Sequence, residues 1–485
     1  MTDAGHHHGP GAGRHDGQDH GSDDGRAAGL DEALRRMADA DTSETARRVF
    51  AAQYDQLARG ASGTLPESTL HPLDDVTRLA DVEVDEAAAD AALRATALLR
   101  LNGGLGTSMG MSGPKSLLTV RDGRTFLDIV IDQVRSARES SGATLPLVLM
   151  QSFRTQGPTR EALAAHPDLA VDGAPTDVVQ NRVPRLRADD LTPVDWPDDP
   201  ELEWAPPGHG DLYTVLYDTG LPRTLLDAGY RYLSVSNIDN LGATPDGRLA
   251  GWFAASGAPF AMEVCRRTRA DRKGGHLAVR TEDEQLVLRE VAQTAEEDLG
   301  AFQDVERHRY FNTNSLWFDL EALDAALAEH DGALGLPLIR NVKTVDPSDK
   351  GSTSVVQVET AMGAAIELFE GAVALEVGRD RFSPVKTTDD LLLVRSDAYE
   401  LDDDFRLVAQ VDPVPSVDLD RDVYKLVDAL ESRFPAGPPS LRGARSFAVE
   451  GDVTFGGDVV VTGEVVVRAD EVGDHVPDGA RLGGE

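Results

Sequence analysis

The stretch Leu101-Asn-Gly-Gly-Leu-Gly-Thr-Ser-Met-Gly-Met-Ser-Gly-Pro-Lys115 decides the fold class of this chain. It follows ATALLRLN (95–102), a short apolar run whose pattern predicts a buried strand. Gly103, Gly104 and Gly106 carry no Cβ, so their backbone N–H groups can surround phosphate oxygens. The spacing is neither the Walker pattern nor the dinucleotide fingerprint. A strand, a long glycine loop and a terminal lysine fit a triphosphate laid along the loop. A tight structural turn is the alternative interpretation.

The sequence on both sides of this loop predicts an α/β fold. TFLDIVIDQVRSARES (125–140) places its apolar residues on one helical face, and Thr125 with Asp128 resembles a capping box. LPLVLMQS (145–152) then predicts a second strand, so the unit is βαβ and a mostly parallel sheet is expected. The same pattern predicts strands at 230–239, 309–320 and 374–377, a helix at about 355–370 and a helix starting near Thr387.

The two ends of the chain differ from this central part (95–398). Residues 1–28 are rich in Gly, His and Asp and are predicted to be a disordered tail, although the histidines at 6–8 could also chelate a metal. Residues 29–94 have helical spacing. After a linker predicted at 399–445, residues 446–485 repeat every six positions, which predicts a short parallel β-helix. An ordinary hairpin with glycine turns is the alternative, and the open end of such a helix offers a surface through which copies could pair.

Composition excludes several classes of function. The formal net charge is −37, which argues against a general nucleic-acid surface. No stretch approaches the ~20 apolar residues of a membrane span, and no signal peptide is expected. Cys265 is the only cysteine, so neither an intrachain disulfide nor a cysteine zinc cluster can form. We therefore expect a cytoplasmic protein that binds neither nucleic acid nor membrane.

A series of collinear motifs resembles the eukaryotic-type UTP–glucose-1-phosphate uridylyltransferase family. The glycine loop LNGGLGTSMGMSGPKSLL is followed in order by QNRVPRL (180–186), PPGHGDLY (206–213), SNIDNLGA (236–243), EVCRRTRADRKGGHL (263–277), YFNTNSLWF (310–318), VQVETAMGAAIELF (356–369) and RFSPVKTTDDLLLV (381–394). The resemblance covers most of the chain beyond residue 95. It implies a Rossmann-like sheet of the glycosyltransferase-A kind, an N-terminal helical segment packed on it and a left-handed C-terminal β-helix.

The resemblance also implies roles for individual residues. The matching positions for UTP are Leu101, Asn102, Gly103, Gly104 and Lys115 for the base and phosphates, with Gln180 and Gly208 reading uracil. Those for the sugar phosphate are His209, Asn237, Ile238 and Asp239, while Glu263, Asn312 and Asn314 are expected to contact glucose. Asp239 is expected to hold Mg²⁺ as well, and Lys386 is expected to complete the phosphate clamp as a catalytic residue beside Lys115.

Elementary chemistry agrees with these roles where it can be applied. Asp239 follows an apolar run, at the strand end where open α/β sheets bind ligands. One carboxylate suffices for Mg²⁺, which keeps waters and takes phosphate oxygens. Lys386 precedes a predicted helix start, which favours anions. A turn-capping Asp and a solvated surface Lys are the structural alternatives.

The expected reaction is direct in-line attack of glucose 1-phosphate on the α-phosphorus of UTP, which forms UDP-glucose and releases pyrophosphate. The sugar phosphate is already anionic, so it needs no general base, and catalysis is mainly positioning and electrostatic stabilisation. Two alternatives stay open. One is a UDP-N-acetylhexosamine pyrophosphorylase, against which Ser108 argues, because an Arg is usual there. The other is an inactive nucleotide-binding scaffold.

Overall fold

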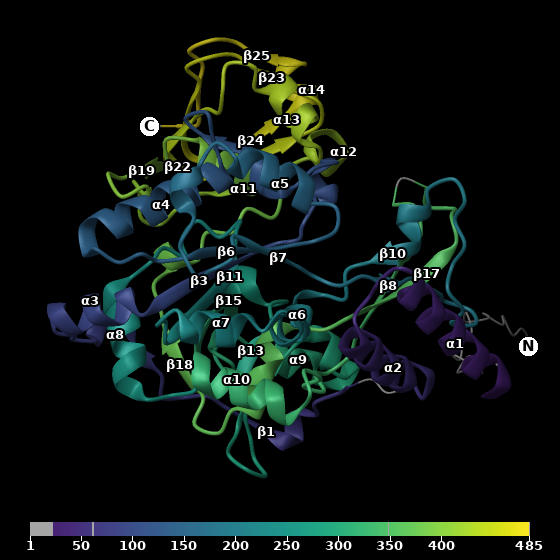
Figure 1. Cartoon of the computed structure of the whole chain (residues 1–485). Helices are drawn as coiled ribbons and strands as arrows, with labels where there is room; N and C mark the ends of the chain where they lie inside the picture. The colour runs from purple at the N-terminus through teal and green to yellow at the C-terminus, as the bar shows by residue number, and fades with distance from the viewer. Residues whose placement is uncertain (1–22, 61–62, 348, 485) are drawn as a thin grey trace, which may run out of the picture.

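The computed structural model describes residues 23–60, 63–347 and 349–484 (Figure 1). Its largest sheet is mixed, with the main order β2-β18-β12-β15-β11-β3-β6-β7. These strands are β2 (Thr77–Arg78), β3 (Thr96–Asn102), β6 (Leu147–Gln151), β7 (Asp177–Val179), β11 (Tyr232–Asn237), β12 (Phe260–Arg266), β15 (Tyr310–Asp319) and β18 (Val373–Glu376). Strands β11, β3, β6 and β7 are parallel neighbours, whereas β15 is antiparallel to β11 and β12. The strands predicted at 95–102, 145–152, 230–239, 309–320 and 374–377 are therefore confirmed.

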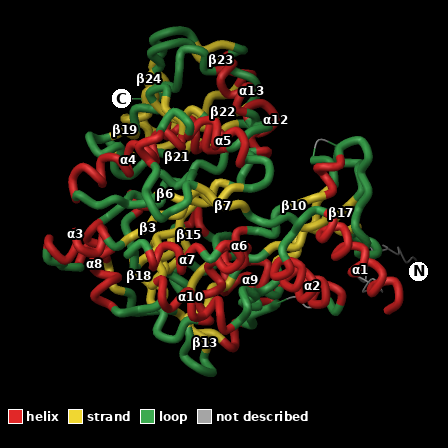
Figure 2. Tube along the Cα trace, viewed as in Figure 1, coloured by secondary structure: helices red, strands yellow, loops and turns green. Residues whose placement is uncertain are grey.

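Helices cover both faces of this sheet (Figure 2). Leu98 of β3 belongs to a core with α4 (Phe126–Ser141), while its neighbour Leu99 faces α6 (Leu212–Thr219), α7 (Leu221–Asp227) and α10 (Leu320–Glu329). This alternation follows from the two-residue period of a strand. The predicted capping box starts α4, since Thr125 Oγ1 accepts from the Asp128 N–H. α11 (Thr388–Arg395) has the same kind of box, with Thr387 as its N-cap, so the helix predicted to start near Thr387 is confirmed.

The N-terminal helices pack on a separate arm that projects to the right in Figure 1. The arm contains α1 (Asp23–Asp39), α2 (Glu44–Ala58), β8 (Val183–Pro184), β9 (Leu186–Arg187), β10 (Trp204–Ala205), β16 (Ile339–Thr344) and β17 (Ser354–Glu359). Phe50 and Tyr54 of α2 meet Val356 and Val358 of β17 in its core. α1 begins inside the stretch predicted to be disordered up to residue 28, and the histidine run lies outside the described residues.

The helix predicted at about 355–370 is wrong. Residues Ser354–Glu359 form β17, which is antiparallel to both β16 and β9, and Met362–Leu368 form a 3₁₀ turn. Three valines at 355, 356 and 358 are fully buried there. Because β-branched residues favour a pleated surface and strand partners are available, tertiary pairing overrides the helical spacing.

The C-terminal unit is a stack of parallel strands. Its main sheet has the order β21 (Ser416–Leu419), β22 (Ser440–Glu450), β24 (Val460–Arg468) and β26 (Arg481–Leu482), with β23 (Thr454–Phe455) and β25 (His475–Val476) paired beside it. All six apolar positions of the repeat are buried: Val453, Phe455, Val459, Val461, Val465 and Val467. Val449 pairs with Val467, a spacing of 467 − 449 = 18 or three six-residue repeats, whereas Val461 pairs with Leu482, a spacing of 482 − 461 = 21, so the length of a turn varies along the stack.

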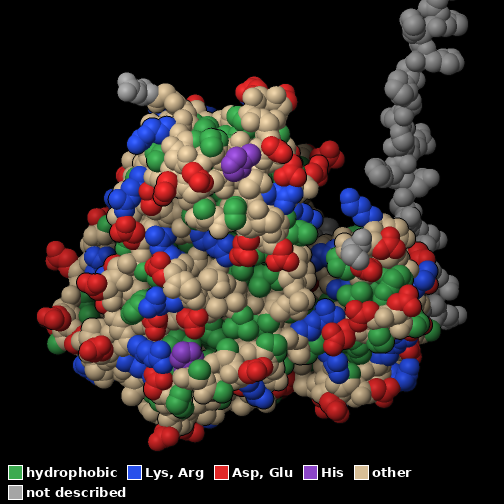
Figure 3. All heavy atoms as spheres, turned by 90° about the horizontal axis from the view of Figure 1, so that it is seen from above, with side chains coloured by type: hydrophobic (Ala, Val, Ile, Leu, Met, Phe, Trp, Pro, Cys, Tyr) green, Lys and Arg blue, Asp and Glu red, His purple; other side chains and the backbone are tan. Residues whose placement is uncertain are grey.

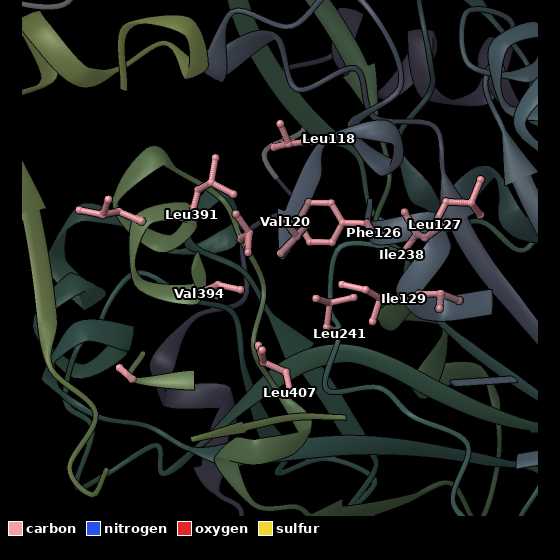
Figure 4. Close-up of a cluster of buried hydrophobic side chains, with 14 of the residues drawn as sticks. Leu118, Val120, Phe126, Leu127, Ile129, Ile238, Leu241, Leu391, Val394 and Leu407 are labelled. Atoms are coloured by element: carbon pink, nitrogen blue, oxygen red, sulfur yellow. The ribbon is translucent and has the colours of Figure 1, made fainter. Parts of the chain in front are cut away.

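The stretch 399–445, predicted as a linker, is folded. It forms β19 (Tyr399–Leu401), β20 (Leu407–Ala409), β21, α12 (Arg421–Tyr424) and α13 (Val427–Arg433) before β22 begins. Figure 4 shows how this stretch packs on the central part of the chain. Leu407 lies in one apolar cluster with Leu391 and Val394 of α11 and with Phe126 and Ile129 of α4. The C-terminal unit is thus joined to the central sheet by a shared core.

The remaining elements complete the central part: β1 (Leu70–Pro72), α3 (Glu86–Arg94), β4 (Thr119–Arg121), β5 (Arg124–Thr125), α5 (Gln156–Leu163), α8 (Gly247–Ser256), β13 (His276–Arg280), β14 (Leu286–Arg289), α9 (Leu299–Phe302) and, at the C-terminus, α14 (Ala469–Val472). Among the described residues, no helix has the length and apolar content needed to cross a membrane. The face in Figure 3 mixes acidic and basic side chains.

Candidate active site

A cleft of about 280 Å³ opens at the carboxyl ends of β3 and β11. Its position follows from the two strands being adjacent and parallel, since their carboxyl ends meet at one edge of the sheet. The lining consists of Leu101, Asn102, Gly103, Gly104, Lys115, Met150, Gln180, Pro206, Gly208, His209, Asn237, Ile238 and Asp239. Eleven of these are residues singled out from the sequence, and only Met150 and Pro206 were not. The structure thus brings most of the predicted site together.

An ammonium–carboxylate pair lies in the cleft. Lys115 Nζ is 2.5 Å from Asp239 Oδ2, and the two side chains are only 15% and 19% exposed. The Lys115 N–H donates to the Gly104 carbonyl (3.0 Å), which closes the glycine loop on itself. Gly106 and Gly110 adopt φ of +64° and +78°, a backbone that side chains with a Cβ rarely accept. The loop is therefore shaped to place a cation beside its own amide groups.

The side of the cleft near Gln180 is closely packed. A Cβ at Gly103 would lie 2.4 Å from Gln180 Oε1, so a larger residue there would displace the end of the Gln180 side chain. Gln180 donates to the Gly208 carbonyl (3.3 Å), and Gly208 has φ +80° with Thr360 O only 2.5 Å from where a Cβ would lie. Gln180 and the Gly208 turn thus form one rigid wall. In contrast, the Asn102 side chain points away from the cleft and donates to Gln151 and Thr159.

His209 is held as a neutral hydrogen-bond donor. The Met362 N–H donates to its Nδ1 (3.0 Å), so Nδ1 is unprotonated and the ring proton resides on Nε2. Burial lowers the pKa of His209 to about 4, well below its ordinary value. At neutral pH the side chain therefore offers an N–H group rather than a positive charge.

Asn312 and Asn314 are brought together by a bulge in β15. Glu263 pairs with Ser315 and the next residue, Val264, pairs with Asn312, so two residues of β15 are unmatched. Asn314 has φ +58°, and its N–H donates to Asn312 Oδ1 (2.8 Å), while Asn312 Nδ2 donates to Asn314 Oδ1 (2.8 Å). Bulges commonly re-aim side chains beside active sites. The predicted sugar-binding asparagines thus form one polar group, although they do not line the cleft itself.

Lys386 lies on a loop that is fastened next to Asp239. Asn240, the following residue, accepts from the Ser383 N–H (2.9 Å) and donates to the Arg381 carbonyl (3.1 Å). Lys386 Nζ is 5.9 Å from the centre of the Phe382 ring. It is not among the residues lining the cleft, so its contact with a nucleotide phosphate stays a prediction.

Glu263 is placed differently from the prediction. Its carboxylate is 2% exposed, and both oxygens are used: Arg381 Nε donates to Oε2 (2.8 Å), and Trp317 Nε1 donates to Oε1 (3.0 Å). Arg100, also buried, lies close enough for the charge of Glu263 to act on its pKa. The Glu263 side chain therefore holds the loop that carries Arg381, and both of its carboxylate oxygens are already hydrogen-bonded rather than free for a sugar.

The structure adds Glu290, which sequence reasoning missed. Burial raises the pKa of its carboxyl to about 7, and the charge of Lys386 acts in the opposite direction. A Cβ at Gly275 would lie 2.4 Å from the Glu290 carboxyl, and the Gly275 carbonyl accepts from the Asn312 N–H (3.1 Å). The Glu290 carboxyl thus lies against Gly275, which holds Asn312, and within range of the charge of Lys386. Its only signal in the sequence was a lone acidic residue after an apolar run.

Asp211 was also missed. Burial raises the pKa of its carboxyl to about 6, against hydrogen bonds from the N–H (2.6 Å) and side-chain amide (3.0 Å) of Asn181. This contact ties the residues that follow Gln180 to the turn that carries His209, so Asp211 supports the wall of the cleft.

The cleft thus combines a glycine loop that ends in lysine with an acidic residue at the end of the next strand, in a mixed α/β sheet. The family described as UTP--glucose-1-phosphate uridylyltransferase matches residues 47–462. The chain belongs to this family, and it is an enzyme of this type.

Similar proteins cover nearly the whole chain. The UTP--glucose-1-phosphate uridylyltransferase of Hordeum vulgare is 36% identical over 440 residues, which are 90% of each chain, and that of Solanum tuberosum is 38% identical over 84% of this chain and 85% of its own. A UDP-glucose phosphorylase structure from Trypanosoma brucei has a TM-score of 0.88 at 43% identity, over 94% of this chain and 99% of its own. A Leishmania major UDP-glucose pyrophosphorylase variant, solved in complex with UDP-glucose, has a TM-score of 0.85 at 43% identity, over 94% and 98%.

Proposed function

We propose that this chain forms UDP-glucose and pyrophosphate from UTP and glucose 1-phosphate. The observation that carries the proposal is the cleft in which Lys115 and Asp239 meet at the glycine loop, in a chain of the uridylyltransferase family. Leu101, Asn102 and Gly104 would contact UTP through the backbone, with Gln180 and the Gly208 turn at the uracil end. The close fit of Gly103 against Gln180 supports a flat, narrow slot for a planar base.

The proposed reaction is in-line attack by a phosphate oxygen of glucose 1-phosphate on the α-phosphorus of UTP. The new P–O bond forms as the bond to pyrophosphate breaks, and no side chain has to remove a proton. The protein's work is to bring two polyanions together and to stabilise the leaving group. Lys115, Lys386 and the loop amides supply positive charge, and neutral His209 donates from Nε2 to a phosphate oxygen. The backbone around Asn237 and Ile238 would hold the sugar phosphate.

Asp239 would hold Mg²⁺, together with phosphate oxygens of the nucleotide. Asp239 suits this role because it is a half-buried carboxylate in the cleft. Mg²⁺ often takes only one or two protein carboxylates and completes its ligands with phosphate oxygens. Among the described residues no cluster of three or more metal-binding side chains occurs, so the ion would depend on the nucleotide. When bound, Mg²⁺ would neutralise phosphate charge. Lys115 would then turn from Asp239 to the phosphates.

The sugar end is proposed to be the group formed by Asn312, Asn314 and Glu290, beside Lys386. Amide and carboxyl groups bind hydroxyls well, and the hydrogen bonds between the asparagines hold them ready. Glu263 is proposed to act only through Arg381, as a support.

We further propose the finer features of the fold and setting. The sheet is of the Rossmann-like, glycosyltransferase-A kind, because β7, β6, β3 and β11 run parallel with ligand residues at their carboxyl ends. The C-terminal stack is a left-handed β-helix, supported by the parallel pairing of all its strands. The protein is proposed to be cytoplasmic and to pair through this unit, where Val472 is 42% exposed. Light scattering of the purified protein tests the pairing.

A substrate panel tests the proposed function. Purified protein would be given Mg²⁺ and UTP with glucose, galactose, mannose or N-acetylglucosamine 1-phosphate, and pyrophosphate release followed. The proposal expects a strong response to glucose 1-phosphate that EDTA abolishes. Preference for N-acetylglucosamine 1-phosphate would favour the alternative, a UDP-N-acetylhexosamine pyrophosphorylase, against which Ser108 argues. Binding of UTP without any turnover would favour an inactive scaffold.

A further inference from the structure

The glycine loop contacts the C-terminal unit at Gly110. Leu426 lies at the elbow between α12 and α13, and its side chain packs on Gly110. A Cβ at Gly110 would lie 3.0, 3.4 and 3.5 Å from Leu426 Cδ2, Cβ and Cγ. Gly110 ends the short turn Thr107–Met109 and has φ +78°, and Leu426 is still 46% exposed. A large apolar side chain that is half in solvent gains little from burial, so stability alone gives little reason for it at this position.

The elbow itself is rigidly mounted. Tyr424, fully buried, donates from its hydroxyl to the Val453 carbonyl (2.6 Å) and accepts from the Val453 N–H (3.2 Å). Asp420 caps α12 and also accepts from the Gly451 N–H (2.9 Å). Because the parallel stack fixes both ends of α12, the Leu426 side chain is presented to the loop from a firm base.

The same segment reaches the Lys386 loop. The Leu419 N–H of β21 donates to Asp389 Oδ1 (3.0 Å) at the start of α11, and Asp390 in the same helix start accepts from the Lys386 N–H (2.8 Å). Residues 419–426 therefore contact both segments that carry the proposed phosphate-binding lysines, Lys115 and Lys386.

We propose that Leu426 is a positioning residue for the reaction, which holds the Gly110 turn and so sets where the loop amides and Lys115 meet the UTP phosphates. The loop has few other anchors at this turn: the Met109 side chain is buried in the core, while Thr107, Ser108 and Gly110 are exposed. Displacement of a binding group by about 1 Å can cost 10²-fold in rate. This role rests on the proposed function.

The test compares Leu426→Ala with Val466→Ala, which removes a similarly exposed aliphatic side chain from the same unit. Leu426→Ala should raise KM for UTP about tenfold and leave KM for glucose 1-phosphate within twofold, with a melting temperature like that of Val466→Ala. Leu426→Met, which still reaches Gly110, should restore most of the loss. Equal KM values for UTP in the Leu426→Ala and Val466→Ala proteins would overturn the proposal.

A double-mutant cycle gives a second, independent measurement. Gly110→Ala introduces a Cβ against Leu426 Cδ2, so its defect should be partly relieved in Gly110→Ala/Leu426→Ala. Multiplicative defects would mean that the two residues do not act on each other and would contradict the proposal. If the wild-type protein turns over no UTP, the proposed function fails separately. Amide hydrogen exchange of the unliganded protein then decides: Leu426→Ala, but not Val466→Ala, should speed exchange at residues 106–111, and unchanged exchange would overturn the positioning role.

Discussion

Replacing Lys115 with methionine removes the ammonium group but keeps most of the side-chain volume. In the structure this group lies 2.5 Å from Asp239, is 15% exposed and is attached to a loop closed by its own N–H bond to Gly104. Because the charge is poorly screened by solvent, its loss should be felt by a bound triphosphate. Removal of one positioned electrostatic donor costs about 2.7–4 kcal/mol in the transition state, or 10²–10³ in rate. We therefore expect kcat/KM for UTP to fall by at least about 10²-fold.

The assay is coupled pyrophosphate release at saturating glucose 1-phosphate and Mg²⁺, over a range of UTP concentrations. Lys115→Arg keeps the charge and should retain more activity than Lys115→Met. A second control, Lys343→Met, removes a half-exposed lysine on β16 and should behave like wild type. A Lys115→Met protein that folds normally and works within threefold of wild type would refute the assignment of this lysine.

Three further predictions concern the rest of the site. Gly208→Ala should abolish most activity and lower the melting temperature, because its Cβ would meet the Thr360 backbone at 2.5 Å; a normal enzyme would contradict the rigid wall. Arg381→Met should cost about 3–5 kcal/mol in urea unfolding by leaving the Glu263 carboxylate buried without its partner, and a change under 1 kcal/mol would contradict the pair. The raised pKa of Glu290 means that its contribution to stability is present below its ordinary value of 4.5 and is lost as the pH rises through about 7. Between pH 5 and 8 the melting temperature of Glu290→Gln should therefore fall less than that of wild type. The control Glu297→Gln, which changes an exposed carboxyl, should follow wild type. Parallel curves of melting temperature against pH for wild type and both variants would contradict the raised pKa of Glu290.

Much of the fold could be predicted because its signals are local. The run before Leu101 is apolar and short, so β3 was expected, and Thr125 with Asp128 marked the start of α4 through a hydrogen-bonding pattern of four consecutive residues. The six-residue repeat likewise predicted the stack of parallel strands. The failure at 355–370 has a non-local cause: Val356 lies between β9 and β16 and packs with Phe50 and Tyr54 of α2, and no local pattern contains those partners.

The site shows the same division. Residues at strand ends and in the glycine loop were predicted, since chemistry and position in the chain agree there. The pairing of Glu263 with Arg381 was not predicted, because the two residues are 381 − 263 = 118 positions apart and a buried ion pair cannot be read from either residue alone. The contact of Glu263 with glucose stays a prediction. Glu290 was missed for the matching reason: its pKa is raised by burial, against the nearby charge of Lys386, and only the folded chain creates both surroundings. The contact of Leu426 with Gly110 is likewise a product of tertiary packing.

The most direct test of the proposed transfer reaction follows the phosphorus atoms of UTP. The protein, Mg²⁺ and glucose 1-phosphate would be mixed with UTP labelled at either the α or the γ position, and the products separated. We expect the α label to appear in UDP-glucose and the γ label in pyrophosphate, at equal rates and only when glucose 1-phosphate is present. Label in inorganic phosphate, or release of pyrophosphate without UDP-glucose, would contradict it.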